Sequence, residues 1–258
     1  MKVVLLAGGA GTRIQEESEY RPKPMVEIGG MPIIWHIMKE YSYFGHHEFI
    51  ICAGYKQEMI KKWFTDYYFY TSDITIDFSN ENKVVVHDRK TEPWRVTVVD
   101  TGGSTMTGGR LRRVRRYVGE ETFLLTYGDG VCDVDMDDLV RFHKEHGRMV
   151  TLTSVTQKQQ KGVLDVAYDN SVRSFREKKP VDAPSINAGY MVMEPGVFDY
   201  LKDDDTILET HVLSKLADEG ELMSYSHNGF WQCMDNMYEK MKLEKMIKNG
   251  EAPWIRWI

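Results

Sequence analysis

The sequence contains few cysteines and no long apolar run. Among its 258 residues there are only three cysteines, Cys52, Cys132 and Cys233, and they are widely separated. An odd number without a paired spacing argues against a disulfide framework, so each is expected to be a small core residue in a reducing cytoplasm. The opening apolar run, Met1 to Ala7, ends at glycines. We therefore expect a cytoplasmic protein with no signal peptide and no membrane-spanning segment.

The sequence also lacks an excess of positive charge. Lys and Arg number 33 against 39 Asp and Glu, which gives a net charge of −6, whereas nucleic-acid binding requires a basic stripe. Neither nucleic acid nor membrane is therefore expected as a partner. The eight histidines form no zinc-type pattern with the cysteines and are expected to be satisfied or solvated. The one dense basic run, predicted to be either a solvated helix or a phosphate contact, is Arg110, Arg112, Arg113, Arg115 and Arg116.

The order of the apolar segments predicts an α/β fold. Short buried strands alternate with helical patterns in the first third, which is the rhythm of a parallel sheet covered by helices. We expect a single Rossmann-like body with a mixed, mainly parallel central sheet flanked by helices, plus small β-hairpin insertions. The expected strands are Val3–Leu6, Phe49–Cys52, Val96–Val99, Phe123–Thr126, Val150–Val155, Val163–Val166, Val172–Phe175 and Gly189–Met193, with a hairpin of Ile74–Asp77 and Val84–Val86. The expected helices are Pro32–Tyr41, Met59–Phe64, Leu111–Val118, one through Leu139 and Phe142, and Asn236–Lys248.

A glycine-rich loop, Gly8-Gly9-Ala10-Gly11-Thr12-Arg13, follows the first strand. Glycines let backbone N–H groups approach a phosphate, and open α/β sheets bind ligands at this end of a parallel strand. Eight residues after Arg13, Pro22 and Pro24 fix the backbone on either side of Lys23. Neither the dinucleotide fingerprint nor the triphosphate P-loop fits this spacing. The loop and the lysine together predict a triphosphate cradle with a pre-positioned cation.

This arrangement resembles the signature of the nucleoside-diphosphate-sugar pyrophosphorylases, a family of nucleotidyltransferases. The resemblance covers nearly the whole chain and is closest to the family's cytidylyltransferases. It implies transfer of CMP from CTP to a phosphorylated acceptor, with release of pyrophosphate and with Mg²⁺ as cofactor. The supporting stretches are Met25–Gly30, Trp35–Met38, Glu92–Trp94, Val99–Gly102, Met106–Leu111, Thr126–Gly130 and Gly250–Trp254.

The resemblance also implies roles for individual residues. Arg13, Lys23 and Lys178 are the implied catalytic residues. Asp129 and Asp235 are the implied magnesium ligands, although Asp235 could instead cap the last helix. The implied nucleotide-binding residues are Leu6, Ala7, Gly8, Gly9, Gly11, Thr12, Arg13, Lys23, Thr101, Gly102, Ser104, Gly108, Arg110 and Asp129. The implied acceptor-binding residues are Gly128, Glu177, Lys178, Asn187, Gly189 and Trp231. Four further aspartates are either rival metal ligands or a solvated acidic loop: Asp133, Asp135, Asp137 and Asp138.

Two segments bear on the acceptor. Phe175–Pro180 resembles the family's F-x-E-K-P element, but an extra lysine leaves Lys178 and Lys179 as alternatives for contacting the acceptor phosphate. Gln157–Asp165 lacks the arginine and aromatic residue that the cytidylyltransferase pattern places there. The resemblance implies α-D-glucose 1-phosphate as acceptor, with another sugar, polyol or small-metabolite phosphate as the alternative. A non-catalytic nucleotide-sensing module would be expected to lose Lys23 or an aspartate first.

The expected mechanism is positioning plus electrostatics. The CTP phosphates lie over Gly8 to Thr12, Arg13 clamps the leaving pyrophosphate, Lys23 neutralises the α-phosphate, and Lys178 orients the acceptor for in-line attack. We expect one nucleotidyltransferase domain over residues 1–258, with a nucleotide-binding half at about 1–150, an acceptor-binding half at about 151–235 and a C-terminal helix and tail at 236–258. A homo-oligomer is implied by the resemblance.

Overall fold

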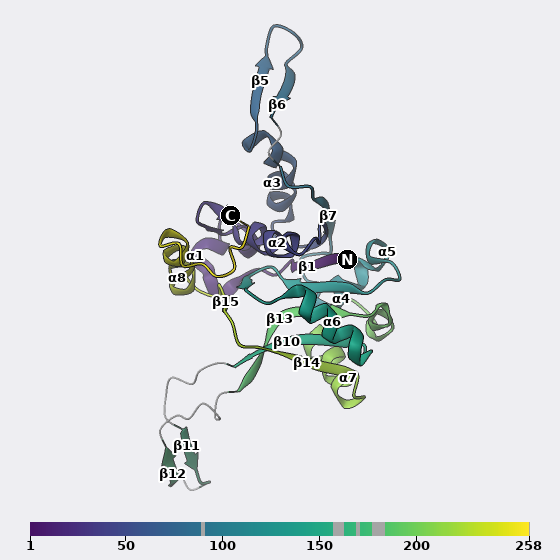
Figure 1. The fold of residues 1–258 in the computed structure, drawn as a ribbon, viewed down its shortest axis with the longest axis vertical. Coiled ribbons are helices and arrows are strands. Elements are labelled where there is room, and N and C mark those ends of the chain that lie inside the picture. The colour runs from purple at the N-terminus through teal and green to yellow at the C-terminus, as the bar shows by residue number, and fades with distance from the viewer. Residues whose placement is uncertain (89–90, 157–162, 169–170, 177–183, 258) are drawn as a thin grey trace.

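The computed structural model describes residues 1–88, 91–156, 163–168, 171–176 and 184–257. Its centre is a seven-stranded sheet with the strand order β14-β10-β13-β8-β1-β4-β7 (Figure 1). These strands are β1 (Lys2–Ala7), β4 (Glu48–Ala53), β7 (Arg95–Asp100), β8 (Phe123–Tyr127), β10 (Val150–Thr156), β13 (Ser185–Met193) and β14 (Leu222–His227). Four neighbouring pairs are parallel, β1 with β4, β1 with β8, β4 with β7 and β10 with β14. Since only the two pairs that β13 forms are antiparallel, the predicted mixed, mainly parallel sheet is confirmed.

Two layers of helices cover the sheet because its strands are apolar on both faces. On one face, side chains from alternate positions of β1 and β4 pack with α2 (Ile33–Tyr43), α3 (Gln57–Tyr70), α6 (Met136–His146) and α8 (Met237–Lys248). The other face packs against α4 (Thr107–Arg113), α5 (Arg115–Val118), α7 (Ser214–Asp218) and the π-helical turn Leu208–Leu213. Among the described residues, no helix combines the length and the apolar character that crossing a membrane requires.

Short elements complete the described chain. Two hairpins pair only within themselves, β5 (Asp73–Asp77) with β6 (Lys83–His87), and β11 (Val163–Val166) with β12 (Val172–Arg176). Both project from the body in Figure 1; the first is the predicted hairpin, and the second pairs two segments that were predicted only as strands. The remaining elements are α1 (Gln15–Ser18), β2 (Glu27–Ile28), β3 (Met31–Pro32), β9 (Gly130–Cys132), β15 (Trp231–Cys233) and the 3-10 turns Thr12–Ile14, Lys23–Met25 and Pro195–Tyr200.

Two of the predicted helices differ from the structure. Pro32 ends β3 and precedes α2 with extended backbone, rather than occupying the first turn of the helix. The helix expected at Leu111–Val118 starts earlier, at Thr107, and breaks at Val114 into α4 and α5. Because of the earlier start, Arg110 lies within α4, and its guanidinium group lies beside Gly8 at the end of β1.

The sheet register explains how the glycine-rich loop and Asp129 come together. In the parallel pair of β1 and β8, Leu6 lies opposite Tyr127, and the Gly128 N–H donates to the Leu6 carbonyl at 3.0 Å. The chain therefore leaves both strands at the same edge of the sheet, which is where ligands bind in open α/β folds.

Candidate active site

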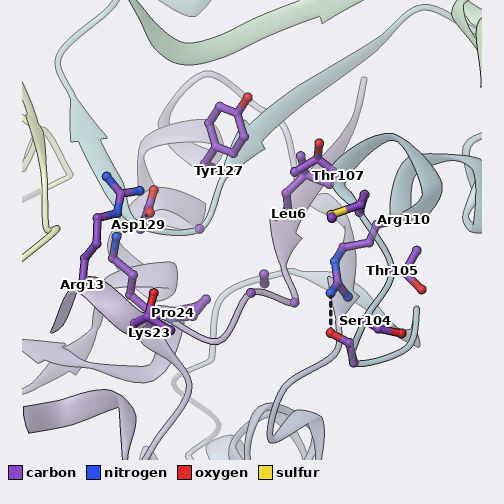
Figure 2. A pocket seen from close by; sticks show the side chains of 18 of the residues that line it. Leu6, Arg13, Lys23, Pro24, Ser104, Thr105, Thr107, Arg110, Tyr127 and Asp129 are labelled. Atoms are coloured by element: carbon purple, nitrogen blue, oxygen red, sulfur yellow. Dashed lines mark hydrogen bonds and ion pairs between the residues drawn. The ribbon is translucent and has the colours of Figure 1, made fainter. Parts of the chain in front are cut away.

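A cavity of about 510 Å³ opens at the carboxyl ends of β1 and β8 (Figure 2). Most of the predicted nucleotide-binding residues line it, and so does Gly128, which was predicted on the acceptor side. The lining residues are Leu6, Ala7, Gly8, Gly9, Gly11, Thr12, Arg13, Lys23, Pro24, Gly103, Ser104, Thr105, Met106, Thr107, Arg110, Tyr127, Gly128, Asp129 and Glu209.

Arg110 is fixed at one end of this cavity. Its guanidinium donates to the Thr101 hydroxyl at 2.8 Å, to the Gly102 carbonyl at 2.7 Å and to the Gly103 carbonyl at 3.2 Å, and the residue is 5% exposed. A Cβ added at Gly8 would lie 2.0 Å from its Nη1, so the loop needs glycine there. Burial lowers the pKa of Arg110 below its ordinary value. The solvated-helix interpretation of the basic run is therefore wrong for this residue.

Three of the remaining arginines of that run face acidic side chains of the protein itself, whereas Arg116 donates to the Tyr117 hydroxyl at 2.6 Å. Arg113 and Arg112 pair with Asp204, and Arg115 lies 3.5 Å from Asp199. These charges are compensated within the chain.

Thr101, Gly102 and Gly108 were predicted to bind nucleotide but do not line the cavity. Thr101 is fully buried, and its hydroxyl donates to the Ala53 carbonyl at 2.7 Å. Together with the Gly102 carbonyl it holds Arg110, so both residues support the cavity wall from behind. At Gly108, an added Cβ would lie 2.7 Å from the Thr206 carbonyl, which makes this glycine a close-packing position of α4.

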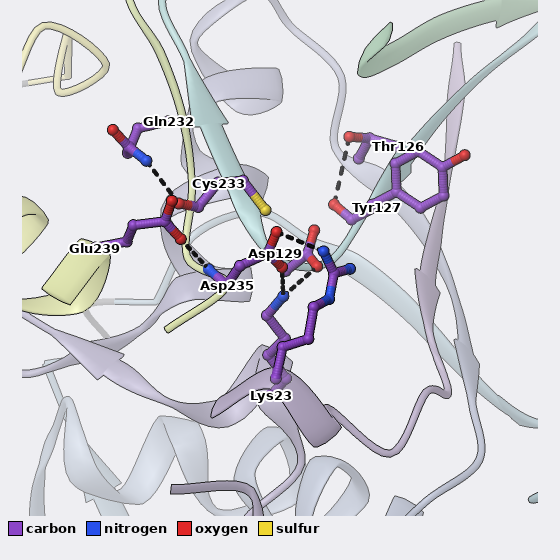
Figure 3. A network of polar contacts seen from close by, with 9 residues as sticks. Lys23, Thr126, Tyr127, Asp129, Gln232, Cys233, Asp235 and Glu239 are labelled. Atoms are coloured by element: carbon purple, nitrogen blue, oxygen red, sulfur yellow. Dashed lines mark hydrogen bonds and ion pairs between the residues drawn. The ribbon is translucent and has the colours of Figure 1, made fainter. Parts of the chain in front are cut away.

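Two carboxylates and two cations meet at the other end of the cavity (Figure 3). Lys23 Nζ lies 2.7 Å from Asp129 Oδ2 and 2.6 Å from Asp235 Oδ1. Arg13 Nη1 lies 2.7 Å from Asp235 Oδ2. Residues from three distant parts of the chain therefore form one charge cluster beside the glycine-rich loop.

Lys23 is 6% exposed, yet it remains a cation. Burial alone would lower the pKa of its ammonium group, but the nearby carboxylates outweigh burial and raise it above its ordinary value. For Asp235, burial acts to raise the pKa, while Lys23 and Arg13 lower it further, so the carboxyl is held below its usual range. Both groups are consequently charged at neutral pH.

Asp235 does not cap the last helix, so that alternative is wrong. The N-cap of α8 is Asn236, whose side chain accepts from the Glu239 N–H at 3.0 Å. The Glu239 carboxylate in turn accepts from the Asp235 N–H at 2.5 Å, which resembles a capping box shifted by one residue, since Asp235 directly precedes the N-cap. This frees the Asp235 carboxylate to face Lys23.

The donor set beside Lys23 fits a hard cation. Ligand atoms of Asp129, Asp235 and Cys233 lie within 4.8 Å of one another. Burial and the neighbouring Asp129 raise the pKa of Cys233 well above its ordinary value, so its sulfur stays a neutral thiol. Two carboxylates without a thiolate are the kind of oxygen ligand set that Mg²⁺ accepts alongside substrate phosphates. Asp129 and Asp235 thus fit the predicted metal role, which stays a prediction.

A second cavity of about 320 Å³ adjoins the first. Arg13, Tyr127, Asp129 and Glu209 line both cavities. The other residues of the second cavity are Thr126, Gly130, Asn187, Ala188, Trp231, Cys233 and Asp235. Because Arg13 lines both spaces, an anionic ligand in either cavity can contact its guanidinium group.

The predicted acceptor-binding residues Asn187 and Trp231 line this second cavity. The Asn187 amide oxygen accepts from the Gly189 N–H at 2.8 Å, and the Trp231 indole N–H donates to the Ala188 carbonyl at 2.8 Å. Gly189 has φ +87°, and an added Cβ would lie 2.6 Å from the Tyr127 ring. The predictions for Glu177, Lys178 and Lys179, and the divergent segment 157–162, lie outside the described residues.

Tyr127 and Glu209 were not predicted as site residues. The Tyr127 hydroxyl donates to one carboxylate oxygen of Glu209, and the Thr107 hydroxyl donates to the other at 2.7 Å. Burial and Glu209 raise the pKa of Tyr127 well above its usual range. Tyr127 directly precedes the Gly128-Asp129 motif, so its place in the sequence could have identified it as a site residue. Nothing in the local sequence of the π-helical turn pointed to Glu209.

The acidic loop after Asp129 is structural in part. Asp135 caps α6 by accepting from the Asp138 N–H at 3.0 Å. Asp133 accepts from the Phe230 N–H at 2.6 Å and lies 2.8 Å from His227 Nε2. Cys132 also lies in this group, a proximity that the sequence spacing did not indicate. Since His227 already has a hydrogen-bond partner, its interpretation as a satisfied histidine is confirmed.

Comparison with known proteins agrees with this geometry. Residues 2–235 match the family described as Nucleotidyl transferase. The chain is 50% identical to glucose-1-phosphate cytidylyltransferase of Salmonella typhimurium and 42% identical to the probable glucose-1-phosphate cytidylyltransferase of Bacillus subtilis, over the full length of each protein.

Solved structures show the same fold. A putative glucose-1-phosphate thymidylyltransferase from Bacillus anthracis superposes with a TM-score of 0.71 at 15% identity, covering 100% of this chain and 97% of that one. The protein HddC from Yersinia pseudotuberculosis superposes with a TM-score of 0.69 at 22% identity, covering 95% and 99%. The chain belongs to the nucleotidyl transferase family.

Proposed function

We propose that this protein transfers CMP from CTP to α-D-glucose 1-phosphate, forming CDP-glucose and releasing pyrophosphate. The observation that carries this proposal is the pair of adjoining cavities that share Arg13 and Asp129, beside the charge cluster that these two residues form with Lys23 and Asp235. The glycine-rich loop supplies a triphosphate site on one side. Full-length relatives at 50% and 42% identity carry the name glucose-1-phosphate cytidylyltransferase, which supports both the nucleotide and the sugar.

In the proposed reaction, a phosphate oxygen of the acceptor attacks the α-phosphorus of CTP. The bond between that phosphorus and the oxygen bridging to the β-phosphate breaks, and pyrophosphate leaves. Arg13 binds the departing phosphates through its guanidinium fork. Lys23 neutralises the negative charge that grows on the α-phosphate, and Lys178 orients the acceptor phosphate. Because that phosphate is already ionised, the reaction requires no general base.

We also propose that Asp129 and Asp235 hold Mg²⁺, which would supply charge neutralisation at the phosphates. Mn²⁺ binding, followed by electron paramagnetic resonance, tests this without turnover. Replacing Asp235 with Asn should weaken Mn²⁺ affinity by on the order of tenfold or more, and Asp137→Asn, at an exposed position in the first turn of α6, serves as the control. Equal affinities in the two variants would remove Asp235 from the metal site.

Initial rates with CTP, UTP and dTTP, monitored by pyrophosphate release, test the nucleotide. A preference for UTP or dTTP would overturn the cytidylyl assignment.

A screen of phosphorylated acceptors with CTP tests the sugar. Strong activity with α-D-glucose 1-phosphate is expected, whereas a much better polyol or small-metabolite phosphate would favour the alternative acceptor class.

The remaining predictions concern the setting of the reaction. We propose that the chain acts as one nucleotidyltransferase domain in a homo-oligomer in the cytoplasm. The central sheet supports the single domain because it contains strands from both halves of the chain.

A further inference from the structure

A buried carboxyl group lies beneath the site on α2. Glu40 is 4% exposed and belongs to a helix that packs its apolar face on the sheet. Its Oε1 accepts from the Cys132 N–H at 3.3 Å, and its Oε2 lies 2.7 Å from the Tyr190 hydroxyl. Among the residues that the structure describes, no lysine, arginine or histidine forms an ion pair with Glu40.

The hydroxyl of Tyr190 has a second close neighbour, the Gly130 carbonyl oxygen at 2.9 Å. A carbonyl oxygen only accepts, so the single phenolic hydrogen of Tyr190 points to Gly130. The contact between Tyr190 and Glu40 Oε2 then needs a hydrogen from the other side. From this geometry we infer that Glu40 is a protonated carboxylic acid, donating to Tyr190 and positioning the strand that follows Asp129.

Burial supports this assignment, since an isolated ionised carboxylate is costly in an apolar core. Burial raises the pKa of Glu40 well above its ordinary value, and Asp133 acts in the same direction. The contacts with the Tyr190 hydroxyl and the Cys132 N–H and the charge of Arg256 oppose the rise without cancelling it. Tyr41, stacked on Tyr190 with ring centroids 5.8 Å apart, and the Cys132 thiol are further titratable groups of this cluster, and burial raises the pKa of each.

Glu40 and Tyr190 affect the site because they fix the position of β9. Together they join α2 to Gly130 and Cys132, the two ends of β9. Gly130 directly follows Asp129, and β9 pairs with β15, which leads to Asp235. The Met234 N–H donates to the Asp129 carbonyl at 2.8 Å. Glu40 is thus a positioning residue for the carboxylate pair, and that role rests on the proposed function.

Glutamine is the matched replacement, because its amide NH₂ can donate to Tyr190 while its oxygen accepts from Cys132. Thermal and denaturant unfolding of the wild type and Glu40→Gln should be compared across pH, with Glu58→Gln on the exposed face of α3 as control. A raised folded pKa means that the wild type loses stability as pH rises above the usual glutamate pKa. The ratio of the folding equilibrium constant of Glu40→Gln to that of the wild type should therefore increase as pH rises, by up to about tenfold per pH unit.

The proton assignment would be overturned if the free energies of unfolding of the two proteins changed in parallel with pH, or if the wild type became more stable relative to Glu40→Gln as pH rises. Either result would show that Glu40 is ionised. If the glutamine variant does not fold, the wild type alone decides the matter through the side-chain carboxyl signals of carbon-13-labelled glutamate. One signal should keep the chemical shift of the protonated acid at neutral pH. Ionised shifts for all glutamates would contradict the assignment.

The positioning role has its own test, which separates it from the proposed function. Glu40→Ala removes both contacts and should lower kcat by on the order of tenfold or more, with a smaller change in KM for CTP. Glu40→Gln should restore kcat. A glutamine variant as slow as the alanine variant would overturn the positioning role. The stability and resonance measurements need no substrate, so an inactive wild type would refute only the proposed reaction.

Discussion

Lys23 is a buried cation whose position is set by its neighbours in the chain and by two remote carboxylates. Pro22 and Pro24 restrict the backbone on either side, and Lys23 begins the 3-10 turn Lys23–Met25. The ammonium group then lies between Asp129 and Asp235. A flexible lysine on the surface would have to be ordered in every catalytic cycle, whereas this one is in place beforehand.

Replacing Lys23 with Ala should lower kcat by a hundredfold or more, which corresponds to about 3 kcal/mol of transition-state stabilisation. The reason is that charge growing at the α-phosphate would lose its fixed partner. Steady-state rates with CTP measure the effect, and Lys62→Ala, an exposed lysine paired only with Asp66 among the described contacts, is the control. Near-normal turnover of Lys23→Ala would remove Lys23 from the reaction.

His36 predicts how stability depends on pH. Burial lowers its pKa to about 4, against which its hydrogen bond to the Ile28 carbonyl acts only weakly. In the unfolded chain His36 is protonated below about pH 6.5, whereas in the folded chain it stays neutral down to about pH 4. The free energy of unfolding therefore falls as pH drops from about 6.5 to about 4. The loss from this group reaches about 3 kcal/mol. Unfolding midpoints measured across this range should drop less steeply in His36→Gln; identical slopes would contradict the assignment.

At the scale of elements, the β5–β6 hairpin differs from the rest of the fold. It stands away from the body beyond α3 (Figure 1), and its register places Ile74 opposite Val86 and Ile76 opposite Val84. These four side chains share one face of a two-stranded ribbon. Ile74, Ile76 and Val84 are 40%, 43% and 44% exposed. An exposed apolar face of this kind is a candidate contact surface.

If the proposed homo-oligomer uses this face, charging it should separate the subunits without unfolding them. The double variant Ile76→Glu, Val84→Lys should give a smaller particle in light scattering coupled to size-exclusion chromatography. Its melting curve should keep the cooperative shape of a folded subunit. Thr75→Glu, on the opposite face of the same strand, is the matched control. An unchanged particle mass in the double variant would exclude this face from the assembly.

The elements that could be predicted are those whose signals are local. The apolar run of β1, the glycines after it and the prolines around Lys23 each specify backbone geometry within a few residues. The contact between Lys23 and Asp235 instead depends on β9 and β15 pairing, and Glu209 reaches Tyr127 through a turn of a distant π-helix. Such long-range contacts are set by strand order and helix packing, and neither can be read from a short stretch of sequence. The resemblance supplied Asp235; no signal supplied Glu209 or Glu40.

At the scale of the whole molecule, the sheet joins the two halves of the chain. β8 lies between β1 of the first half and β13 of the second. Separating the halves would expose the edge of β8 that pairs with β13. The core therefore has no break at about residue 150.

The intact chain should consequently unfold as one unit. Tryptophan fluorescence and far-ultraviolet circular dichroism should give coincident transitions in denaturant. A fragment of residues 1–150 should fail to reach a folded state, because it lacks β10, β13 and β14. Two separated transitions, or a folded fragment, would indicate two independent domains.

The shared wall of the two cavities has a consequence for stereochemistry. Arg13, Tyr127, Asp129 and Glu209 border both spaces, so the proposed reaction should have donor and acceptor bound together. Among the residues that line the two cavities, the one thiol is that of Cys233 in the second cavity, which is held in its protonated form and is a poor nucleophile. A single displacement then inverts the configuration at the α-phosphorus. With a chiral α-thio analogue of CTP, the product should have inverted handedness, and retention would reveal a covalent enzyme intermediate.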